Sequence, residues 1–199
     1  KEWSLAFEFT YRYPDLIHVK PSNETPIEPI IQEIKKFQVI HVPPFSGIGA
    51  EETRYDLAYQ ELLIGQGKPG DILRNLLLEV YREKQQEWSE LCEVIQEIFG
   101  YKLLPPEYSG RPFIVCEYQL LFSDRKPQPK FDISCAGSGF LQVLMLLGFF
   151  YARPASVLLL DEPDAHLHVI LQKQVYDRLR TIARNRGCQL LIATHSEVL

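Results

Sequence analysis

The sequence of 199 residues contains no apolar run long enough to cross a membrane, which would need about 18 residues. Its longest apolar stretch, residues 140–152, is shorter and is interrupted by Gln142. The sequence has no signal peptide, and it begins at Lys1 rather than at Met. We therefore expect a cytoplasmic protein without membrane contact, and we interpret the sequence as a piece of a longer chain.

Cysteine and positive charge are also in short supply. The four cysteines include no CxxC pair, so neither a metal knot nor a disulfide framework is expected. Lys and Arg number 21 against 26 Asp and Glu, for a formal net charge of -5. This balance gives no basic footprint for nucleic acid, although a local groove or another part of the protein could supply one.

The phosphate-binding pattern GxxxxGK[ST] is absent as well. Gly67-Lys68 is the only Gly-Lys pair, and its spacing places Leu62 where a glycine is needed. Pro69 then occupies the position that requires Ser or Thr. Any phosphate loop that this domain uses is therefore expected upstream of Lys1.

The first third of the chain has the alternation of β-structure. Aromatic and apolar residues at every second position of residues 3–13 predict a half-buried antiparallel strand, which is more plausible than a base-stacking platform. The proline-rich residues 14–29 indicate a loop, and residues 37–42 a short buried strand.

The middle of the chain is predicted to be helical. Apolar residues recur at steps of three and four between Leu73 and Ile98, which predicts one long helix or two broken near Gln85. Gly70 and Asp71 suit the start and Gly100 the end, while residues 113–122 suggest a strand.

The last third changes to alternating strands and helices. The expected elements are an apolar helix at 140–151, a strand at 157–160, a helix at 168–186 ended by Gly187, and a strand at 190–193. Strand, helix and strand in this order predict a right-handed parallel crossover. The fold class is therefore α/β, with a parallel core sheet preceded by an antiparallel β piece and a helical subdomain.

Three ionisable side chains follow the predicted parallel strands. Asp161 and Glu162 come directly after one strand, and His195 follows the next. Because ligands of such sheets bind at the carboxyl ends of the strands, these residues are candidates for phosphoryl-transfer chemistry. Asp161 suits a magnesium ligand acting through water, and Glu162 suits a general base. An acidic turn with no such function is the simpler alternative.

A glycine-rich turn precedes the apolar helix. Glycines in Gly137-Ser138-Gly139 would let backbone N–H groups approach a phosphate, and a helix N-terminus favours an anion. Taken alone, the turn is equally compatible with a simple helix cap. Its order and spacing relative to Asp161, Glu162 and His195 make the set specific.

Together these motifs resemble the ABC ATPase superfamily of P-loop NTPases. Residues 137–139 resemble the signature motif, residues 157–162 Walker B with its catalytic glutamate, residues 163–168 the D-loop, and His195 the switch histidine. The wording DEPDAHLH is closer to the SMC-like branch, and especially to ATPases of the OLD (overcoming lysogenization defect) type and their AAA-labelled relatives. The resemblance is strong over residues 134–199 and moderate over 37–78.

The resemblance implies a partial ATPase domain over residues 1–199 that lacks Walker A. Its parts would be a β-rich part (1–50), a helical subdomain (51–110), and a part with the signature, Walker B, D-loop and switch histidine (111–199).

It also implies ATP and Mg²⁺ as cofactors and a homodimer in the intact protein, with each signature loop closing on the partner's ATP. Glu162 and His195 would be catalytic, and Asp161 would be the metal ligand. The implied nucleotide-contacting residues are Gly137, Ser138, Gly139, Gln142 and Asp164. The usual signature serine falls at Gly137, with Ser138 as its candidate replacement.

The expected role is an ATPase of a DNA-processing, repair or phage-defence protein, with DNA contacted through other parts and a Toprim nuclease possible after Leu199. The fragment alone is expected to be inactive. An ATP-gated clamp without hydrolysis is the alternative, and the presence of Glu162 favours hydrolysis. A transporter subunit is less favoured, because transporter D-loops usually read Ser-Ala-Leu-Asp. A transition-metal site using His166 and His168 is a further, weaker alternative.

Overall fold

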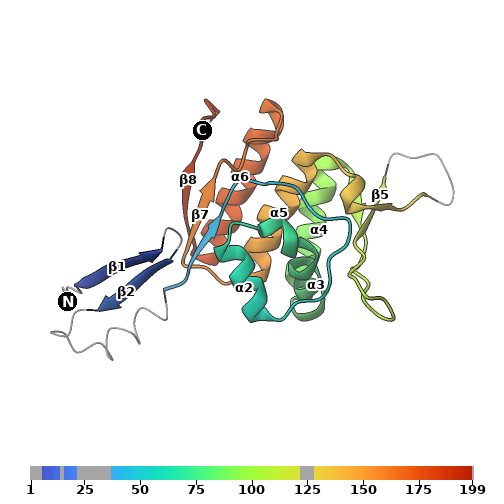
Figure 1. Ribbon diagram of the computed structural model, residues 1–199. Coiled ribbons are helices and arrows are strands. Elements are labelled where there is room, and N and C mark those ends of the chain that lie inside the picture. The colour runs from blue at the N-terminus through green and yellow to red at the C-terminus, as the bar shows by residue number, and fades with distance from the viewer. Residues whose placement is uncertain (1–5, 14–15, 22–36, 122–127, 199) are drawn as a thin grey trace. The chain divides into compact units, whose positions relative to one another are not determined.

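A computed structural model describes residues 6–13, 16–21, 37–121 and 128–198 of the chain (Figure 1). The chain divides into two compact units, Lys1–Gln38 and Val39–Leu199. No helix in the described part of the chain combines the length and the apolar character that crossing a membrane requires.

The first unit contains an antiparallel pair of strands, β1 (Phe7–Tyr13) and β2 (Leu16–Pro21). The predicted antiparallel strand is confirmed over residues 7–13, and its first residues lie outside the described ones. Its aromatic face is not buried, since Phe9 and Tyr11 are 63% and 73% exposed. The prediction of a loop over residues 14–29 is wrong where β2 lies. The prolines nearest to β2 come before it, at Pro14, and at its end, at Pro21, so they do not interrupt this β-forming stretch.

The second unit is built on a parallel sheet with the order β3-β7-β8. Its strands are β3 (Val39–Val42), β7 (Val157–Asp161) and β8 (Gln189–Ala193), and helix α6 (Val169–Arg186) connects the last two. His168 caps the start of α6, and Gly187 ends it in the left-handed conformation. The predicted parallel strand–helix–strand unit and the α/β class are thus confirmed.

Only one face of this sheet is well covered. The register places Val42, Leu158 and Leu160 on one face, where these three side chains are 1–2% exposed and pack against the helices (Figure 1). On the opposite face, Val39 and Leu191 are 50% and 55% exposed. The expectation that 37–42 and 190–193 are buried strands was therefore wrong for alternate residues, because apolar composition alone does not say which face is covered.

The most deeply buried helix is α5 (Ser138–Ala152), and every residue from Phe140 to Ala152 is buried. Helices α3 (Leu73–Glu83) and α4 (Gln85–Phe99) pack against it. The predicted break near Gln85 is confirmed at Lys84, whose Nζ donates to the carbonyls of Tyr151 and Ala152 at the end of α5.

Helix α2 (Leu57–Gly65) was not predicted. Its apolar residues are spread around the helix instead of forming one stripe, so it lacks the periodic pattern that identifies an amphipathic helix, and Leu57 and Leu62 are exposed. A short 3₁₀ helix, Pro69–Ile72, leads from α2 into α3.

A second sheet is antiparallel and consists of β4 (Tyr101–Leu103), β5 (Glu117–Leu120) and β6 (Phe131–Asp132). The strand expected at 113–122 is confirmed only within β5. The other two strands are too short to leave a pattern in the sequence. Rings of Tyr101, Tyr118 and Phe140 pack together with centroids 5.0–5.4 Å apart, which attaches this sheet to the start of α5.

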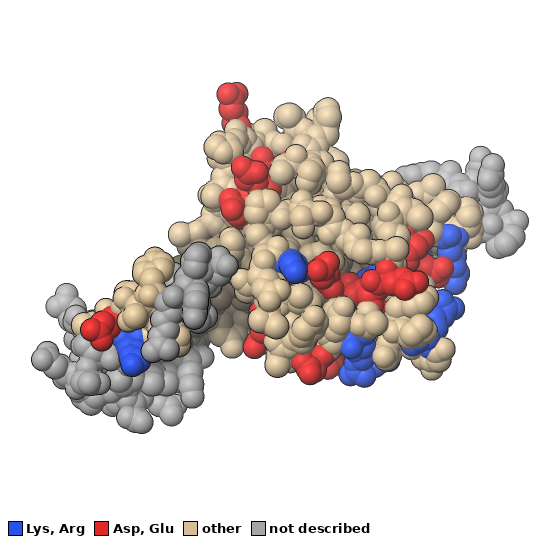
Figure 2. Space-filling model, in the orientation of Figure 1, with Lys and Arg blue, Asp and Glu red and all other residues tan. Residues whose placement is uncertain are grey.

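Charge on the surface follows the acidic composition. On the face drawn in Figure 2, acidic side chains gather in a band, and basic side chains lie next to this band, mostly toward the lower right of the view. Among the described residues, this face therefore offers no continuous basic surface to nucleic acid.

Gly70→Ala should destabilise the second unit. A Cβ at Gly70 would lie 1.9 Å from the carbonyl oxygen of Gly47, and main-chain atoms cannot rotate away. Such overpacking costs about 1–3 kcal/mol. Gly65→Ala is the matched control, because its Cβ would meet no atom within 4 Å. Urea unfolding of both variants measures the difference, and equal stabilities would contradict the close approach of Gly70 to Gly47.

Candidate functional site

The carboxyl edge of the parallel sheet brings three of the predicted residues together. Asp161 is the last residue of β7, and the backbone N–H of Glu162 donates to the carbonyl of Ala193 at the end of β8 (2.8 Å). Two residues further on, His195 Nε2 lies 3.6 Å from Glu162 Oε1. The His195 side chain is 93% exposed and that of Glu162 44% exposed, so both remain open to a ligand.

Glu162 also has an unusual backbone. Its φ is +45°, and among the described residues it is the only non-glycine with a positive φ. This conformation costs on the order of 1–3 kcal/mol and persists only where the surrounding structure enforces it. The strain turns the chain sharply at the end of β7 and leaves the carboxylate at the open edge of the sheet, and such strain is concentrated at functional sites.

The segment that follows, residues 163–168, packs back into the domain. Asp164 is only 9% exposed and accepts hydrogen bonds from Tyr176 Oη (2.7 Å) and Thr194 Oγ1 (2.6 Å). Its carboxylate therefore lies inside the domain and bonds protein groups, instead of facing the edge where a nucleotide was expected.

The glycine-rich turn leaves the start of α5 open. Gly137 is the N-cap residue and supplies no side-chain hydrogen bond, and both Gly137 and Ser138 are exposed. The first N–H groups of the helix are therefore available to an anion. Gly139 serves packing: a Cβ there would lie 2.8 Å from the carbonyl oxygen of His166, so this glycine lets α5 approach residues 163–168.

Gln142 does not reach the open edge. Its side chain is fully buried within α5, and neither Nε2 nor Oε1 has a hydrogen-bond partner among the described residues. The proposed contact of Gln142 with a nucleotide therefore has no support in this geometry. The sequence pattern could not predict the burial of Gln142, because the pattern predicts the helix but not which elements pack around it.

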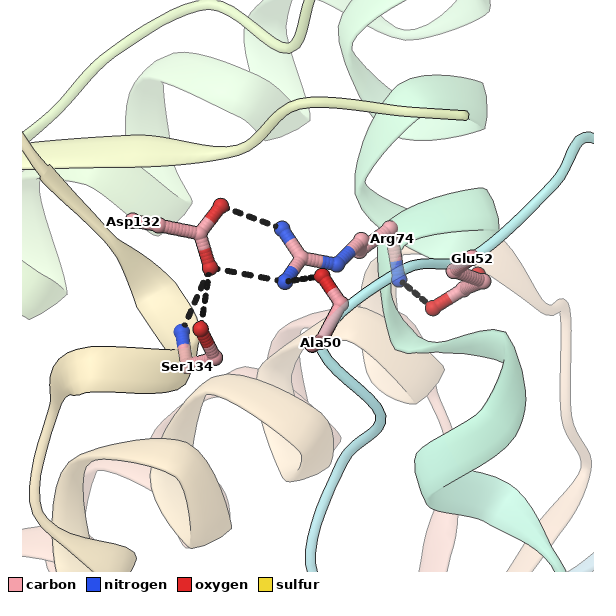
Figure 3. Close-up of polar contacts among 5 residues, drawn as sticks. All are labelled: Ala50, Glu52, Arg74, Asp132 and Ser134. Atoms are coloured by element: carbon pink, nitrogen blue, oxygen red, sulfur yellow. Dashed lines mark hydrogen bonds and ion pairs between the residues drawn. The ribbon is translucent and has the colours of Figure 1, made fainter. Parts of the chain in front are cut away.

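A buried polar junction that the sequence did not reveal holds the chain just before the glycine-rich turn (Figure 3). Arg74, 1% exposed, donates to both carboxylate oxygens of Asp132 (2.8 Å each) and to the carbonyl of Ala50 (3.2 Å). Asp132 in turn accepts from the backbone N–H and the hydroxyl of Ser134. This bidentate ion pair fixes residues 132–134, from which the turn at 137–139 begins.

Glu52 lies on the other side of the same junction. Its carboxylate accepts hydrogen bonds from the backbone N–H groups of Arg74 (2.8 Å) and Asn75 (2.6 Å) and from Asn75 Nδ2 (2.6 Å). Burial raises the pKa of Glu52 from 4.5 to about 7, outweighing these donors, which favour the ionised form.

His166 and His168, the ligands of the alternative transition-metal site, contact other parts of the protein. His166 Nε2 lies 3.2 Å from the carbonyl oxygen of Phe45, and the Phe45 and His166 rings meet edge to face. His168 caps α6. Within the described ranges, no group of three or more His, Cys, Asp and Glu side chains could hold a metal ion. Asp161 fits magnesium, which proteins bind through one or two carboxylates together with substrate phosphates.

A parallel sheet with acidic residues at its carboxyl edge, beside an open helix N-terminus, defines an α/β domain of the P-loop NTPase type. A family comparison agrees with this class. Residues 5–199 match the family described as "AAA domain, putative AbiEii toxin, Type IV TA system". The chain belongs to this AAA domain family.

The chain is also similar to solved structures of SMC proteins. A structure titled for ATP-driven dimerization and DNA-stimulated activation of SMC ATPases is 18% identical, with a TM-score of 0.47, over 63% of this chain and 74% of that one. An SMC head bound to the C-terminal winged-helix domain of ScpA is 20% identical, with a TM-score of 0.46, over 59% and 37%.

The SMC head domain from Thermotoga maritima is 14% identical, with a TM-score of 0.45, over 92% and 55%. The chain thus spans only 37% of the length of the ScpA-bound SMC head and 55% of the length of the Thermotoga maritima head domain. A search of curated proteins found no match.

Glu52→Gln should remove a pH dependence of stability. Because the pKa of Glu52 is higher in the folded state, its contribution to the free energy of unfolding is fully present below about pH 4.5. It is lost as pH rises through about 7. Between about pH 5 and 8, the wild type should therefore lose stability relative to Glu52→Gln, by at most about 1.4 kcal/mol per unit of pKa shift. Denaturant unfolding across this range tests it, with exposed Glu51→Gln as the control that should keep the wild-type slope.

Gln142→Met should leave the stability unchanged or raise it by about 1–2 kcal/mol, because it removes a buried amide that has no partner. Gln60→Met is the matched comparison. Gln60 is also buried, but it donates to the carbonyl of Tyr55 (3.1 Å) and accepts from Arg153 (2.6 Å). Its loss should cost about 1–3 kcal/mol. Thermal unfolding compares the two, and a large loss for Gln142→Met alone would reveal a partner of Gln142.

Proposed function

We propose that this domain binds Mg-ATP and hydrolyses it at the carboxyl edge of the β3-β7-β8 sheet. The observation that carries the proposal is the meeting of Asp161, Glu162 and His195 at this edge, with the strained backbone of Glu162 between two parallel strands. Membership of the AAA domain family supports the same chemistry.

Each residue has a separate task in this proposal. Asp161 would hold Mg²⁺, and the bound ion would neutralise charge on the phosphates. Glu162 accepts a proton from the attacking water, for which its 44% exposure leaves room. His195, exposed beside it, donates a hydrogen bond to the terminal phosphate. No contact with the nucleotide is assigned to Gln142 or Asp164, because both are buried.

We further propose that the active site is completed by a second copy of the domain. Gly137 and Ser138 are exposed at the start of α5, where unpaired N–H groups can bind the phosphate of a nucleotide held by the partner. The resemblance to ABC-type ATPases supports this arrangement, in which the phosphate loop comes from a part of the protein other than residues 1–199.

The biological setting that fits best is an OLD-like ATPase in DNA processing or phage defence. The family description, which names a putative AbiEii toxin of a type IV toxin–antitoxin system, is compatible with a defence role. Because the sequence is net acidic, with a formal charge of -5, any contact with DNA is assigned in this proposal to other parts of the protein.

An ATP-gated clamp that does not hydrolyse its nucleotide is the alternative function. It needs nucleotide binding and dimer closure, but it does not need an exposed carboxylate at position 162. The strained and solvent-accessible Glu162 is the observation that favours hydrolysis over the clamp.

In the full-length protein, Glu162→Gln should lower ATP turnover about a hundredfold or more while leaving ATP binding intact, because the amide keeps the shape and cannot act as a base. The variant should also accumulate as an ATP-bound dimer in size-exclusion chromatography. Glu197→Gln is the control, since Glu197 is another exposed carboxylate just beyond β8. Unchanged single-turnover hydrolysis by Glu162→Gln would remove Glu162 from the mechanism and favour the clamp.

A further inference from the structure

His195 is exposed, but the residues on both sides of it are anchored. Thr194 Oγ1 donates to Asp164 Oδ1 (2.6 Å), and it also accepts from the backbone N–H of Ser196 (2.9 Å). The hydroxyl of Ser196 donates to Gln172 Oε1 (2.7 Å). A side chain that is 93% exposed is thus carried by a loop with fixed attachment points before and after it.

Both attachment points lead to residues 163–168. Asp164 belongs to this segment, and Gln172 Nε2 donates to the carbonyl of Leu167 within it (3.0 Å). Asp164 is also held from behind by the hydroxyl of Tyr176 in α6 (2.7 Å). The position of His195 therefore depends on residues 163–168 as well as on the strand that precedes it.

Residues 163–168 also touch the two other edges of the candidate site. Gly139 at the start of α5 lies against the carbonyl oxygen of His166, where even a methyl group would be too close. The His166 ring meets the backbone of Phe45 beyond β3. A movement of the α5 N-terminus or of the loop after β3 would displace this segment, and the Asp164–Thr194 hydrogen bond connects that displacement to His195.

We propose that Asp164, Thr194 and Gln172 are positioning residues that hold His195 beside Glu162, so that the histidine follows the position of residues 163–168. The inference rests on the proposed ATPase function, because it assigns His195 to that reaction. None of the three residues contacts substrate in this scheme, and Asp164 acts from inside the domain.

Thr194→Val is the decisive variant, tested in the full-length protein with a steady-state ATPase assay. Valine has nearly the shape of threonine but cannot donate to Asp164, so kcat should fall about tenfold or more, since small displacements of catalytic groups have effects of this size. The KM for ATP should stay within about twofold, because His195 would be only one of several groups that contact ATP, and its displacement acts mainly on the reacting geometry.

Two further variants separate positioning from general stability. Thr194→Ser restores the hydroxyl and should return kcat to within about threefold of the wild type. Tyr176→Phe removes the other hydrogen bond to the same carboxylate and a longer one to Thr194 Oγ1 (3.5 Å), but it leaves the 2.6 Å bond from Thr194 in place, so kcat should be close to the wild type. If the cluster served only stability, Tyr176→Phe and Thr194→Val would lower kcat alike.

A second readout does not depend on ATP turnover. The ¹H–¹³C NMR signal of the His195 ring can be assigned by its loss in His195→Asn. This signal should shift or broaden in Thr194→Val and should remain in place in Thr194→Ser and Tyr176→Phe.

The outcomes distinguish this inference from the proposed function. If the wild type hydrolyses ATP and Thr194→Val keeps both its kcat and its His195 signal, the positioning role is overturned while the ATPase function stands. If the wild type shows no hydrolysis, the proposed function fails, and the NMR signal alone then decides whether Thr194 positions His195.

Discussion

Helix α5 has no polar face, and the rest of the second unit is arranged to cover it. From Phe140 to Ala152 every residue is buried, so neighbours must pack on all sides of the helix. Helices α3 and α4, the antiparallel sheet and one face of the parallel sheet supply that cover. Burial of this apolar surface is the main favourable term for such a fold, and it fixes the α5 N-terminus at the edge of the parallel sheet.

Polar residues then refine the position of that N-terminus. The Arg74–Asp132 pair holds the chain as it enters the turn, and Gly139 lets the turn lie against residues 163–168. A buried ion pair of this kind adds little net stability over apolar packing, but it specifies one geometry, because each partner is costly to leave unpaired. The hydrophobic core thus places the site coarsely, and buried hydrogen bonds set its details.

The sequence predicted the elements whose signals are local. The apolar run of α5, the strand before Asp161, and the ends of α4 and α6 at Gly100 and Gly187 each follow from a few neighbouring residues. It also predicted which residues reach the carboxyl edge, because strand ends in a parallel sheet lie together.

The sequence could not predict contacts between distant residues. Asp164 looked like a ligand residue, yet its partners Tyr176 and Thr194 lie 12 and 30 positions away and bury it. Gln142 was predicted to contact the nucleotide, and its burial, which results from packing by several elements, left no signal in the sequence. The junction of Glu52 with Arg74 left no motif at all, since it joins residues 22 positions apart.

At Glu162, the stability of the fold and the chemistry proposed for this edge have opposing preferences. Stability alone would place glycine at this position, because glycine adopts a φ of +45° without strain. A glycine there would relax the end of β7 and would at the same time remove the carboxylate from the open edge. In the proposed ATPase, the native residue therefore trades folding free energy for reactivity, and thermostable variants selected without regard to activity should accumulate changes at this position.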